Sequence, residues 1–311
     1  MHTSLALRAV VVAAAAVAVA STACVRSASP AAPTSAGESP RPVVSCPAPV
    51  VSQSFTGGPI AVAFAPPQAA GGVLPLSVSC SPPSGAAFSI GTTTVLCTFV
   101  DAVASQTTCS FTVRVLGPPR LSATRFLAFG DSITAGQTFD TYPDRLSFKL
   151  RQRYQTQNPG VVNAGVAGEN AFPFGQQRLP SVLGSSGAQA LLLMEGSNDL
   201  IGGATGASLG LDALTNMVRT AHGRGVVVFL ATIPPQGPSR SFTRGLVPGF
   251  NDGVRGIAQR EGATLVDIYA AMIGDPSLIG PDDLHPTVQG HEVMAQTFFD
   301  AIVRVLDLPP E

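Results

Sequence analysis

The sequence has no tryptophan and only three tyrosines, and charged residues make up 12% of its 311 positions. That charged share is about half of what is usual in soluble domains. Lysine and arginine nearly balance aspartate and glutamate, for a formal net charge of -1. Binding to nucleic acid needs a basic face, so the composition argues against nucleic acid as a partner. The hydrophobic share of 45% supports a buried core and excludes a chain that is disordered throughout.

Charge is scarcest in the first third of the chain. Beyond Pro118 lie 31 of the 37 charged residues, which indicates two differently built regions. At the start, Arg8 precedes an unbroken Ala/Val run over residues 9–20, which is shorter than the roughly 20 residues that span a bilayer. Small residues follow at 21–23. We therefore predict a signal peptide over residues 1–23 and an exported protein; a buried core helix is disfavoured, because nothing amphipathic follows.

Cys24 comes directly after this small-residue run. The segment resembles a bacterial lipoprotein signal, in which the cysteine after the cleavage point receives lipid, although Ser21 replaces the larger aliphatic residue preferred there. The resemblance implies an envelope protein with a lipid anchor to the membrane at Cys24, with full secretion as the open alternative. Residues 24–45 are rich in Ser, Pro and Ala and lack periodicity, which predicts an extended stalk.

No cysteine occurs beyond residue 109, and four lie within about 65 residues: Cys46, Cys80, Cys97 and Cys109. In an exported chain this spacing predicts two disulfides, and the sequence does not choose among the three possible pairings. A zinc site is disfavoured because no histidine is near and the paired C-x₂-C spacing is absent. We expect no metal and no other cofactor in this protein.

Residues 46–116 have the pattern of an all-β domain. Residues 76–80 and 111–115 alternate with period two, residues 92–99 are rich in β-branched side chains, and Pro and Gly pairs mark turns between such runs. These features predict a small antiparallel β-sandwich. Residues 117–122, which begin Gly-Pro-Pro, are predicted to be a linker.

Four stretches of this domain resemble a HYR (hyalin repeat) module: residues 46–47, 80–85, 91–97 and 109–113. The resemblance implies an immunoglobulin-like sandwich that serves as a spacer or binds a cell-envelope or glycan partner. By analogy with sandwich geometry it favours the pairs Cys46–Cys97 and Cys80–Cys109. The module has no cluster of His, Asp or Glu, so we do not expect catalysis there.

From residue 123 to 311 the pattern alternates between strand and helix. Five short apolar runs are separated by longer segments with helical spacing: residues 126–129, 161–166, 191–194, 226–233 and 264–268. Such alternation predicts an α/β domain whose parallel sheet is covered by helices on both faces. Ligand sites in such sheets gather at the carboxyl ends of the strands. Polar blocks follow the first three runs, and a fourth, Asp-Asp-Leu-His-Pro at residues 282–286, lies near the C-terminus.

A serine at a strand-to-helix turn, such as Ser132, needs a base and an orienting group before it can act as a nucleophile. His285 is the best base, because Pro286 predicts a helix start just after it. Asp282, three residues earlier, can fold back onto its Nδ1. Donors for an oxyanion could come from the backbone N–H groups of Ser132 and Gly168 and from the Asn198 amide.

The four blocks, in this order, resemble the SGNH/GDSL hydrolase family over about residues 124–306. The resemblance implies a three-layer αβα, flavodoxin-like fold. It makes Ser132 the nucleophile and His285 the base, and its Asp-x-x-His spacing selects Asp282 as the residue that holds the base. It also makes Gly168 and Asn198 oxyanion donors. Glu169 stands where the family often has Asp.

Each residue has a simpler interpretation alone, such as a helix cap at Ser132. Together they predict an exported serine esterase that acts on acetyl or short acyl esters of glycans or lipids. The alternative is an envelope adhesion or binding protein with an inactive hydrolase domain. Near the site, Phe172 and Phe174 could line an acyl pocket or anchor their loop, and Arg240 and Arg244 could meet an anionic substrate or simply be solvated.

Overall fold

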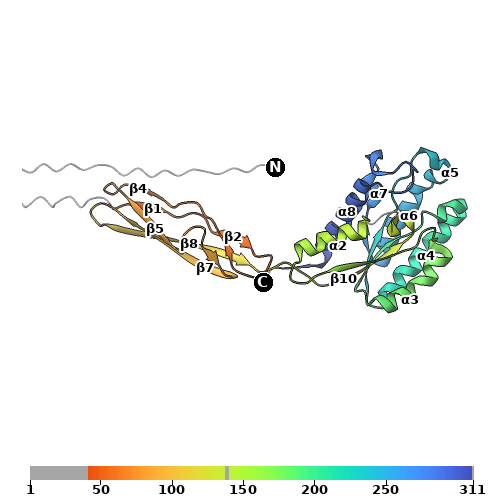
Figure 1. Cartoon of the computed structure of the whole chain (residues 1–311), viewed down its shortest axis with the longest axis horizontal. Coiled ribbons are helices and arrows are strands. Elements are labelled where there is room, and N and C mark those ends of the chain that lie inside the picture. The colour runs from red at the N-terminus through yellow and green to blue at the C-terminus, as the bar shows by residue number, and fades with distance from the viewer. Residues whose placement is uncertain (1–40, 137–139, 310–311) are drawn as a thin grey trace, which may run out of the picture. The chain divides into compact units, whose positions relative to one another are not determined.

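The computed structural model describes residues 41–136 and 140–309, which form an all-β module and an α/β domain (Figure 1). The predicted signal peptide, Cys24 and the stalk up to residue 40 lie outside the described residues. None of the described helices is both long enough and apolar enough to cross a membrane.

The all-β module is built on one four-stranded sheet. Its order is β2 (Val50–Gln53), β8 (Gln106–Leu116), β7 (Gly91–Val100) and β5 (Ser77–Ser81). β5, β7 and β8 are antiparallel, as predicted, whereas β2 runs parallel to β8. Two further strand pairs are β1 (Val43–Ser45) with β4 (Gln68–Ala70), and β3 (Ile60–Ala61) with β6 (Ala87–Phe88). Phe88 and Val62 pack on the inward side chains of β7 and β8, and this contact forms the core.

The disulfides join Cys46 to Cys109 and Cys80 to Cys97, so the pairing favoured by analogy was wrong. Cys80 and Cys97 are direct register partners on neighbouring strands β5 and β7. Cys97 on β7 is also the register partner of Cys109 on β8. Cys80 and Cys109 are therefore both neighbours of Cys97 in the sheet. Cys46 follows β1, which contacts β8, and it forms its disulfide with Cys109 on β8.

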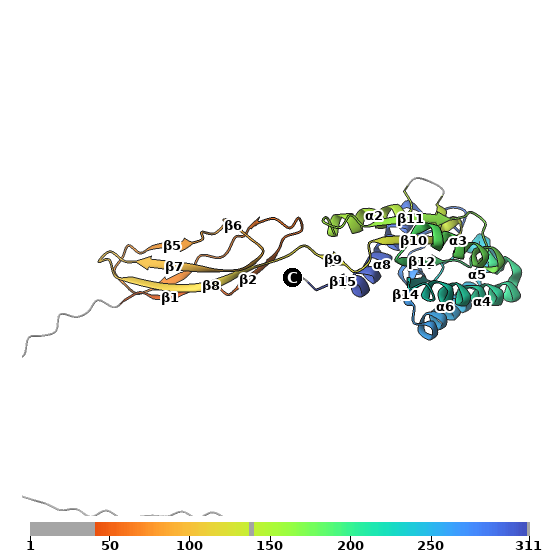
Figure 2. The same ribbon diagram turned by 90° about the horizontal axis from the view of Figure 1, so that it is seen from below.

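The α/β domain contains a five-stranded parallel sheet (Figure 2). The order is β11 (Gly160–Gly165), β10 (Arg125–Gly130), β12 (Ala190–Met194), β13 (Val227–Ala231) and β14 (Thr264–Val266). Each predicted apolar run overlaps one of these strands. The order 2-1-3-4-5 is that of flavodoxin-like sheets, so the predicted fold class is confirmed. β12 is buried along its whole length, as expected of a central strand covered on both faces.

Helices cover both faces of this sheet (Figures 1 and 2). α2 (Tyr142–Arg153) packs against α8 (Val288–Leu306) on one face; α3 (Gln176–Ser186), α4 (Gly203–His222) and α6 (Val247–Glu261) cover the other. Seven short helical elements occupy the loops: α1 (Ser132–Ala135), η1 (Ala171–Gly175), η2 (Asp199–Gly202), η3 (Pro238–Arg240), α5 (Ser241–Arg244), α7 (Ile268–Met272) and η4 (Pro276–Leu278). All seven lie in the parts of the chain that the structure describes.

A short antiparallel pair joins the beginning of this domain to its end. β9 (Arg120–Leu121) lies within the segment predicted as a linker and pairs with β15 (Asp307–Leu308), with Leu121 opposite Asp307. Leu121 is buried in the core of the α/β domain. Arg153 on α2 adds an ion pair to Asp307 at 2.7 Å.

Candidate active site

Ser132 stands at the turn between the first strand of the sheet and a very short helix. β10 ends at Gly130, and Asp131 then caps α1 by accepting a hydrogen bond from the Ile133 N–H at 2.9 Å. Ser132 is therefore the first residue of α1, at the carboxyl end of a central strand, where it is partly exposed.

Two glycines allow α1 to sit directly on the strand ends. A Cβ at Gly130 would lie 2.1 Å from Thr134 Oγ1, and a Cβ at Gly165 on β11 would lie 2.1 Å from the Ala135 nitrogen. Any larger residue at either position would displace the helix. Glycine at these two strand ends thus fixes the place of Ser132.

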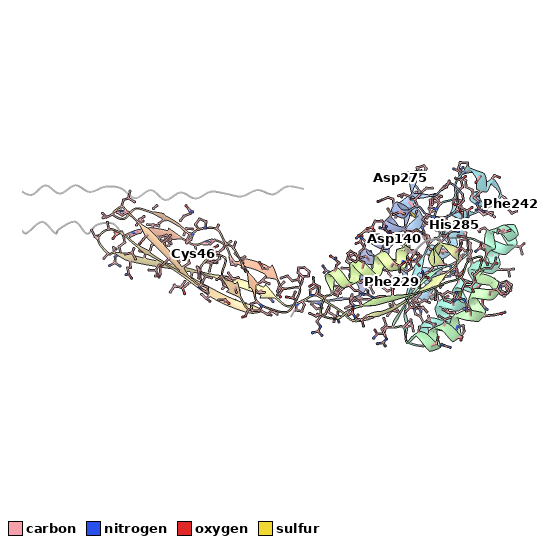
Figure 3. The ribbon with its side chains drawn as sticks, viewed as in Figure 1. Cys46, Asp140, Phe229, Phe242, Asp275 and His285 are labelled. Atoms are coloured by element: carbon pink, nitrogen blue, oxygen red, sulfur yellow. A yellow bond between two sulfur atoms is a disulfide. The ribbon has the colours of Figure 1, made fainter. Side chains whose placement is uncertain are left out.

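His285 meets Ser132 from the far end of the sequence. It lies in the loop before α8 (Figure 3), and its Nε2 is 2.9 Å from Ser132 Oγ although 153 residues separate the two. Its Nδ1 lies 2.5 Å from Asp282 Oδ2. The structure therefore brings hydroxyl, imidazole and carboxylate into one hydrogen-bonded chain.

Asp282 is held as a carboxylate. Burial tends to raise its pKa, but hydrogen bonds from the His285 side chain and from the backbone N–H groups of His285 and Leu284 outweigh that effect and bring the pKa to about 2. An ionised Asp282 that accepts from Nδ1 leaves Nε2 free to accept a proton from the serine hydroxyl.

The segment after β13 braces the loop that carries Asp282 and His285. Asp283 accepts from the Gly237 N–H through its carbonyl at 2.9 Å and from the Ser239 N–H through its carboxylate at 2.7 Å. Arg240 Nε donates to the Asp282 carbonyl at 3.2 Å. The role found for Arg240 is thus a structural one within the loop.

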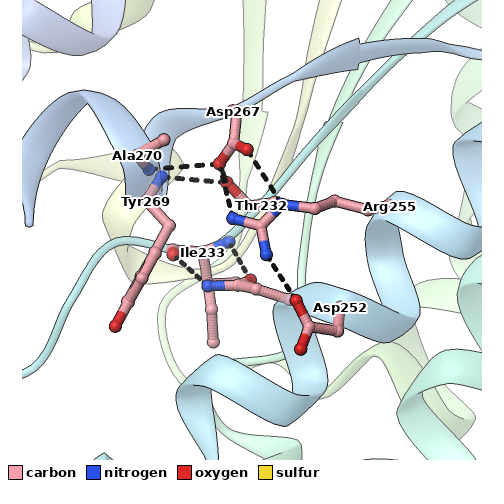
Figure 4. Close-up of polar contacts among 8 residues, drawn as sticks. Thr232, Ile233, Asp252, Arg255, Asp267, Tyr269 and Ala270 are labelled. Atoms are coloured by element: carbon pink, nitrogen blue, oxygen red, sulfur yellow. Dashed lines mark hydrogen bonds and ion pairs between the residues drawn. The ribbon is translucent and has the colours of Figure 1, made fainter.

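A polar network joins residues that directly follow β13 and β14 (Figure 4). The Asp267 carboxylate accepts hydrogen bonds from Arg255, from Thr232 Oγ1 at 3.0 Å and from the Ala270 N–H. Burial tends to raise the pKa of Asp267, but the hydrogen bonds, chiefly that from Arg255, lower it below its ordinary value. The Asn251 side chain on α6 accepts a hydrogen bond from the Ile233 N–H and donates one to the Ile233 carbonyl, each at 2.9 Å.

Three candidate oxyanion donors lie after the three neighbouring strands β10, β11 and β12. Gly168 has a φ of +77°, and within the described residues neither its N–H nor that of Ser132 has an acceptor. Asn198 Nδ2 donates to the Glu169 carbonyl at 2.8 Å. An amide nitrogen carries two hydrogens, so one remains for a ligand.

The sequence prediction missed two acidic residues next to this region. Asp199 accepts hydrogen bonds from the backbone N–H groups of Ala171 at 2.8 Å and Phe172 at 3.0 Å, which ties η1 to the end of β12. Its place beside Asn198 was the only signal in the sequence. Glu195 is fully buried, which no sequence pattern indicated. Phe172 and Phe174 are both exposed on η1.

A cavity of about 520 Å³ lies between the 235–248 segment and α7, lined in part by Gln236, Arg244, Tyr269 and Ile273. Ser132 does not line it, so it adjoins the bracing segment rather than the nucleophile. Across residues 41–136 and 140–309, no group of three or more His, Cys, Asp or Glu side chains is placed to hold a metal ion.

Comparison with protein families gave two matches. The GDSL-like Lipase/Acylhydrolase family matches residues 128–293, which is more than half of the chain, and the HYR domain matches residues 39–115. A search of curated proteins found no match.

Among solved structures, the α/β domain is similar to several hydrolases. The lipase/acylhydrolase from Enterococcus faecalis has a TM-score of 0.53 and 20% identity, and the match covers 60% of this chain and 98% of that one. LAE5, an alpha/beta hydrolase from the metagenome of Lake Arreo, Spain, has a TM-score of 0.51 and 22% identity over 59% and 96%. A catalytic mutant of Axe2, an acetylxylan esterase from Geobacillus stearothermophilus, has a TM-score of 0.51 and 20% identity over 59% and 95%.

Proposed function

The chain belongs to the GDSL-like lipase/acylhydrolase family and is a carboxylic ester hydrolase, and we propose that it is an exported serine esterase that uses Ser132, His285 and Asp282. The observation that carries the proposal is the continuous hydrogen-bonded chain from Ser132 Oγ through the His285 ring to Asp282.

In the proposed acylation step, Ser132 Oγ attacks the ester carbonyl carbon while His285 Nε2 takes the hydroxyl proton. The carbonyl π electrons move to oxygen and form a tetrahedral oxyanion. When this intermediate collapses, the bond to the alcohol oxygen breaks and His285 returns its proton to that oxygen. Water then attacks the acyl-serine in the same way and releases the acid.

The oxyanion would accept hydrogen bonds from the N–H groups of Ser132 and Gly168 and from the Asn198 amide. Support comes from their placement after three adjacent strands and from the unused hydrogens on each. Loss of one such donor typically costs about 2.7–4 kcal/mol of transition-state stabilisation.

For the substrate we propose acetyl or short acyl esters of extracellular glycans or lipids. The fold shared with an acetylxylan esterase and the attached HYR domain support a glycan ester outside the cell. The two disulfides are consistent with an oxidising, extracellular location. The HYR module would then hold the enzyme at an envelope or glycan partner.

Export and anchoring form a separate part of the proposal. They depend on the signal peptide at residues 1–23 and on lipid attachment at Cys24. We expect Cys24→Ser to move the protein from the membrane fraction to the soluble fraction. An unchanged distribution would contradict lipidation and leave the esterase proposal intact.

The esterase proposal is tested by turnover of p-nitrophenyl acetate. Ser132→Ala should lower kcat at least about 10³-fold, because the nucleophile is removed. Ser185→Ala is the matched control, since that hydroxyl is exposed on α3 and its one hydrogen bond within the described residues is to the Val182 carbonyl. Equal rates for wild type and Ser132→Ala would overturn the proposed mechanism.

A further inference from the structure

Four buried carboxyl groups interact electrostatically with one another, and three of them are sequence neighbours of the candidate oxyanion donors: Asp131, Glu169, Glu195 and Asp199. Three of them have donors. Asp131 and Asp199 accept backbone N–H groups, as described above, and Glu169 forms an ion pair with Arg178. The fourth, Glu195, is completely buried at the end of β12.

Glu195 is unusual because neither of its carboxyl oxygens has a hydrogen-bond donor among the described residues. Among the neighbouring acids, the carboxyl group of Glu169 is the one that can share a hydrogen bond with Glu195, and this interaction raises the pKa of Glu195. Two carboxylates that face each other in a buried site cannot both be ionised without a large cost. If one of the two carboxyl groups is protonated, its O–H donates a hydrogen bond to the other, and the repulsion is removed.

The proton belongs on Glu195. Burial raises the pKa of Glu195 well above its ordinary value, and the negative charges of Asp131 and Glu169 raise it further. Glu169, in contrast, has its charge matched by Arg178, whose Nε lies 2.7 Å from Oε1. A metal ion does not offer another explanation, because the described residues contain no group of side chains placed to bind one.

We propose that Glu195 is a neutral carboxylic acid whose O–H donates to the Glu169 carboxylate, and that this hydrogen bond positions the oxyanion donors Gly168 and Asn198. The second half rests on the proposed esterase function, whereas the first half does not. Glu195 is a positioning residue in this scheme and touches no reacting atom.

The path from Glu195 to the donors is short. Arg178 holds the Glu169 carboxylate from one side, and its guanidinium is itself fixed by the Phe129 ring at 3.9 Å and by the Ala164 carbonyl at 3.0 Å. In the proposal, Glu195, which directly follows β12, donates to the same carboxylate. The carbonyl of Glu169 accepts the Asn198 amide at 2.8 Å, and its own nitrogen is joined to Gly168.

Kinetics of three variants test the positioning role. Glu195→Gln keeps an N–H donor of the same length, so we expect kcat within about threefold of wild type. Glu195→Met removes the donor, and Glu195→Asp places the carboxyl group one methylene farther from Glu169. Both variants should have a kcat lowered about tenfold or more, with KM nearly unchanged. An equal loss of kcat in the glutamine variant would overturn the proposal, because it would show that a carboxyl group itself is needed.

A double-mutant cycle separates positioning from a general loss of structure. If Glu195 acts through Asn198, Glu195→Met should cost clearly less in an Asn198→Ala background than in wild type. Full additivity would contradict the proposed path to Asn198. Glu195→Asp serves in the same cycle if the methionine variant fails to fold.

Protonation is measured without any enzymatic activity. The infrared spectrum of the full chain at pH 9, where Asp131 with its pKa of about 7 is ionised, should contain the carbonyl stretch of a protonated carboxylic acid, and Glu195→Gln should remove it. Absence of that band from wild type would overturn the neutral acid even if the esterase is active. If the band is present while Ser132→Ala and wild type turn over ester equally, the esterase mechanism fails and the neutral acid stands.

Discussion

Asp282 and Asp283 are neighbours in the chain, but their carboxylates bind different parts of the protein. Asp282 Oδ2 lies 2.5 Å from His285 Nδ1, whereas Asp283 Oδ2 accepts the Ser239 N–H at 2.7 Å. Asp283 has a φ of 60°, a left-handed conformation that turns the chain between the two. One acid faces the imidazole, and the other ties the loop to its bracing segment.

This division predicts opposite outcomes for two similar substitutions. Asp282→Asn should lower kcat by about 10³–10⁴-fold with a small change in KM, because the amide no longer fixes the Nδ1–H tautomer of His285. Asp283→Asn should leave kcat near wild type, since asparagine tolerates the left-handed conformation and still accepts from Ser239. Steady-state kinetics on p-nitrophenyl acetate measures both, and equal losses in the two variants would refute the assignment of Asp282.

Asn198 gives a second prediction. Asn198→Ala removes a proposed oxyanion donor and should lower kcat about 10²–10³-fold. Asn216→Ala is the control, because that side chain is exposed on α4 and, in the part of the chain that the structure describes, hydrogen-bonds to Gln176 alone, at 3.3 Å. A kcat for the Asn198 variant within twofold or so of the control would argue against an oxyanion role.

Asp131 gives a prediction about stability and pH. Burial raises its pKa from 3.8 to about 7, and the charges of Asp199 and Glu169 add to this, while the Ile133 N–H and His285 oppose it. The folded-state pKa lies above the unfolded one, so this group favours folding at low pH. That contribution is complete below about pH 4 and is lost as the pH rises through about 7.

Asp131→Asn should remove that pH dependence while keeping an acceptor for the Ile133 N–H. Relative to wild type, the variant should gain up to about 4 kcal/mol in free energy of unfolding between pH 4 and pH 8. Urea denaturation at the two pH values measures the difference. A free-energy difference that is the same at both would show that Asp131 does not titrate as described.

The disulfides give a prediction about the all-β module. Non-reducing peptide mapping should recover Cys46 linked to Cys109 and Cys80 linked to Cys97. The first pair spans 63 residues and the second 17, so loop entropy predicts stabilisations of about 4 and 3 kcal/mol. Serine replacement of the first pair should therefore lower the free energy of unfolding more than replacement of the second. Recovery of any other pairing would contradict the structure.

Much of the fold of the α/β domain was predictable because its central strands are buried on both faces. Such strands appear as continuous apolar runs, and all five runs became strands of one sheet. Helix faces were harder to predict, because apolar residues with helical spacing are not all packed: Leu209 on α4 and Val305 on α8 are both exposed. Helical spacing shows which residues share a face, but it does not show how far a neighbouring element covers that face.

The candidate site was predictable to the level of residue types and strand ends. Ser132, Asp282 and His285 were expected to meet, and the structure places them in hydrogen-bonding contact. The interaction between Glu169 and Glu195 could not be predicted from the sequence, because neither the burial of an acid nor the proximity of two distant acids produces a periodic pattern. The disulfide pairing depended on strand register, which the cysteine spacing alone did not contain.

The pairing of Leu121 with Asp307 also has a consequence for engineering. When the first and last strands of a domain are adjacent, a few added residues can join them, and new termini can be introduced in another loop. Such a circular permutation does not distort the sheet. The same adjacency lets the hydrolase be inserted into a surface loop of another protein with little distortion of its host. The short pair of β9 and β15 thus allows the hydrolase domain to be moved into another protein.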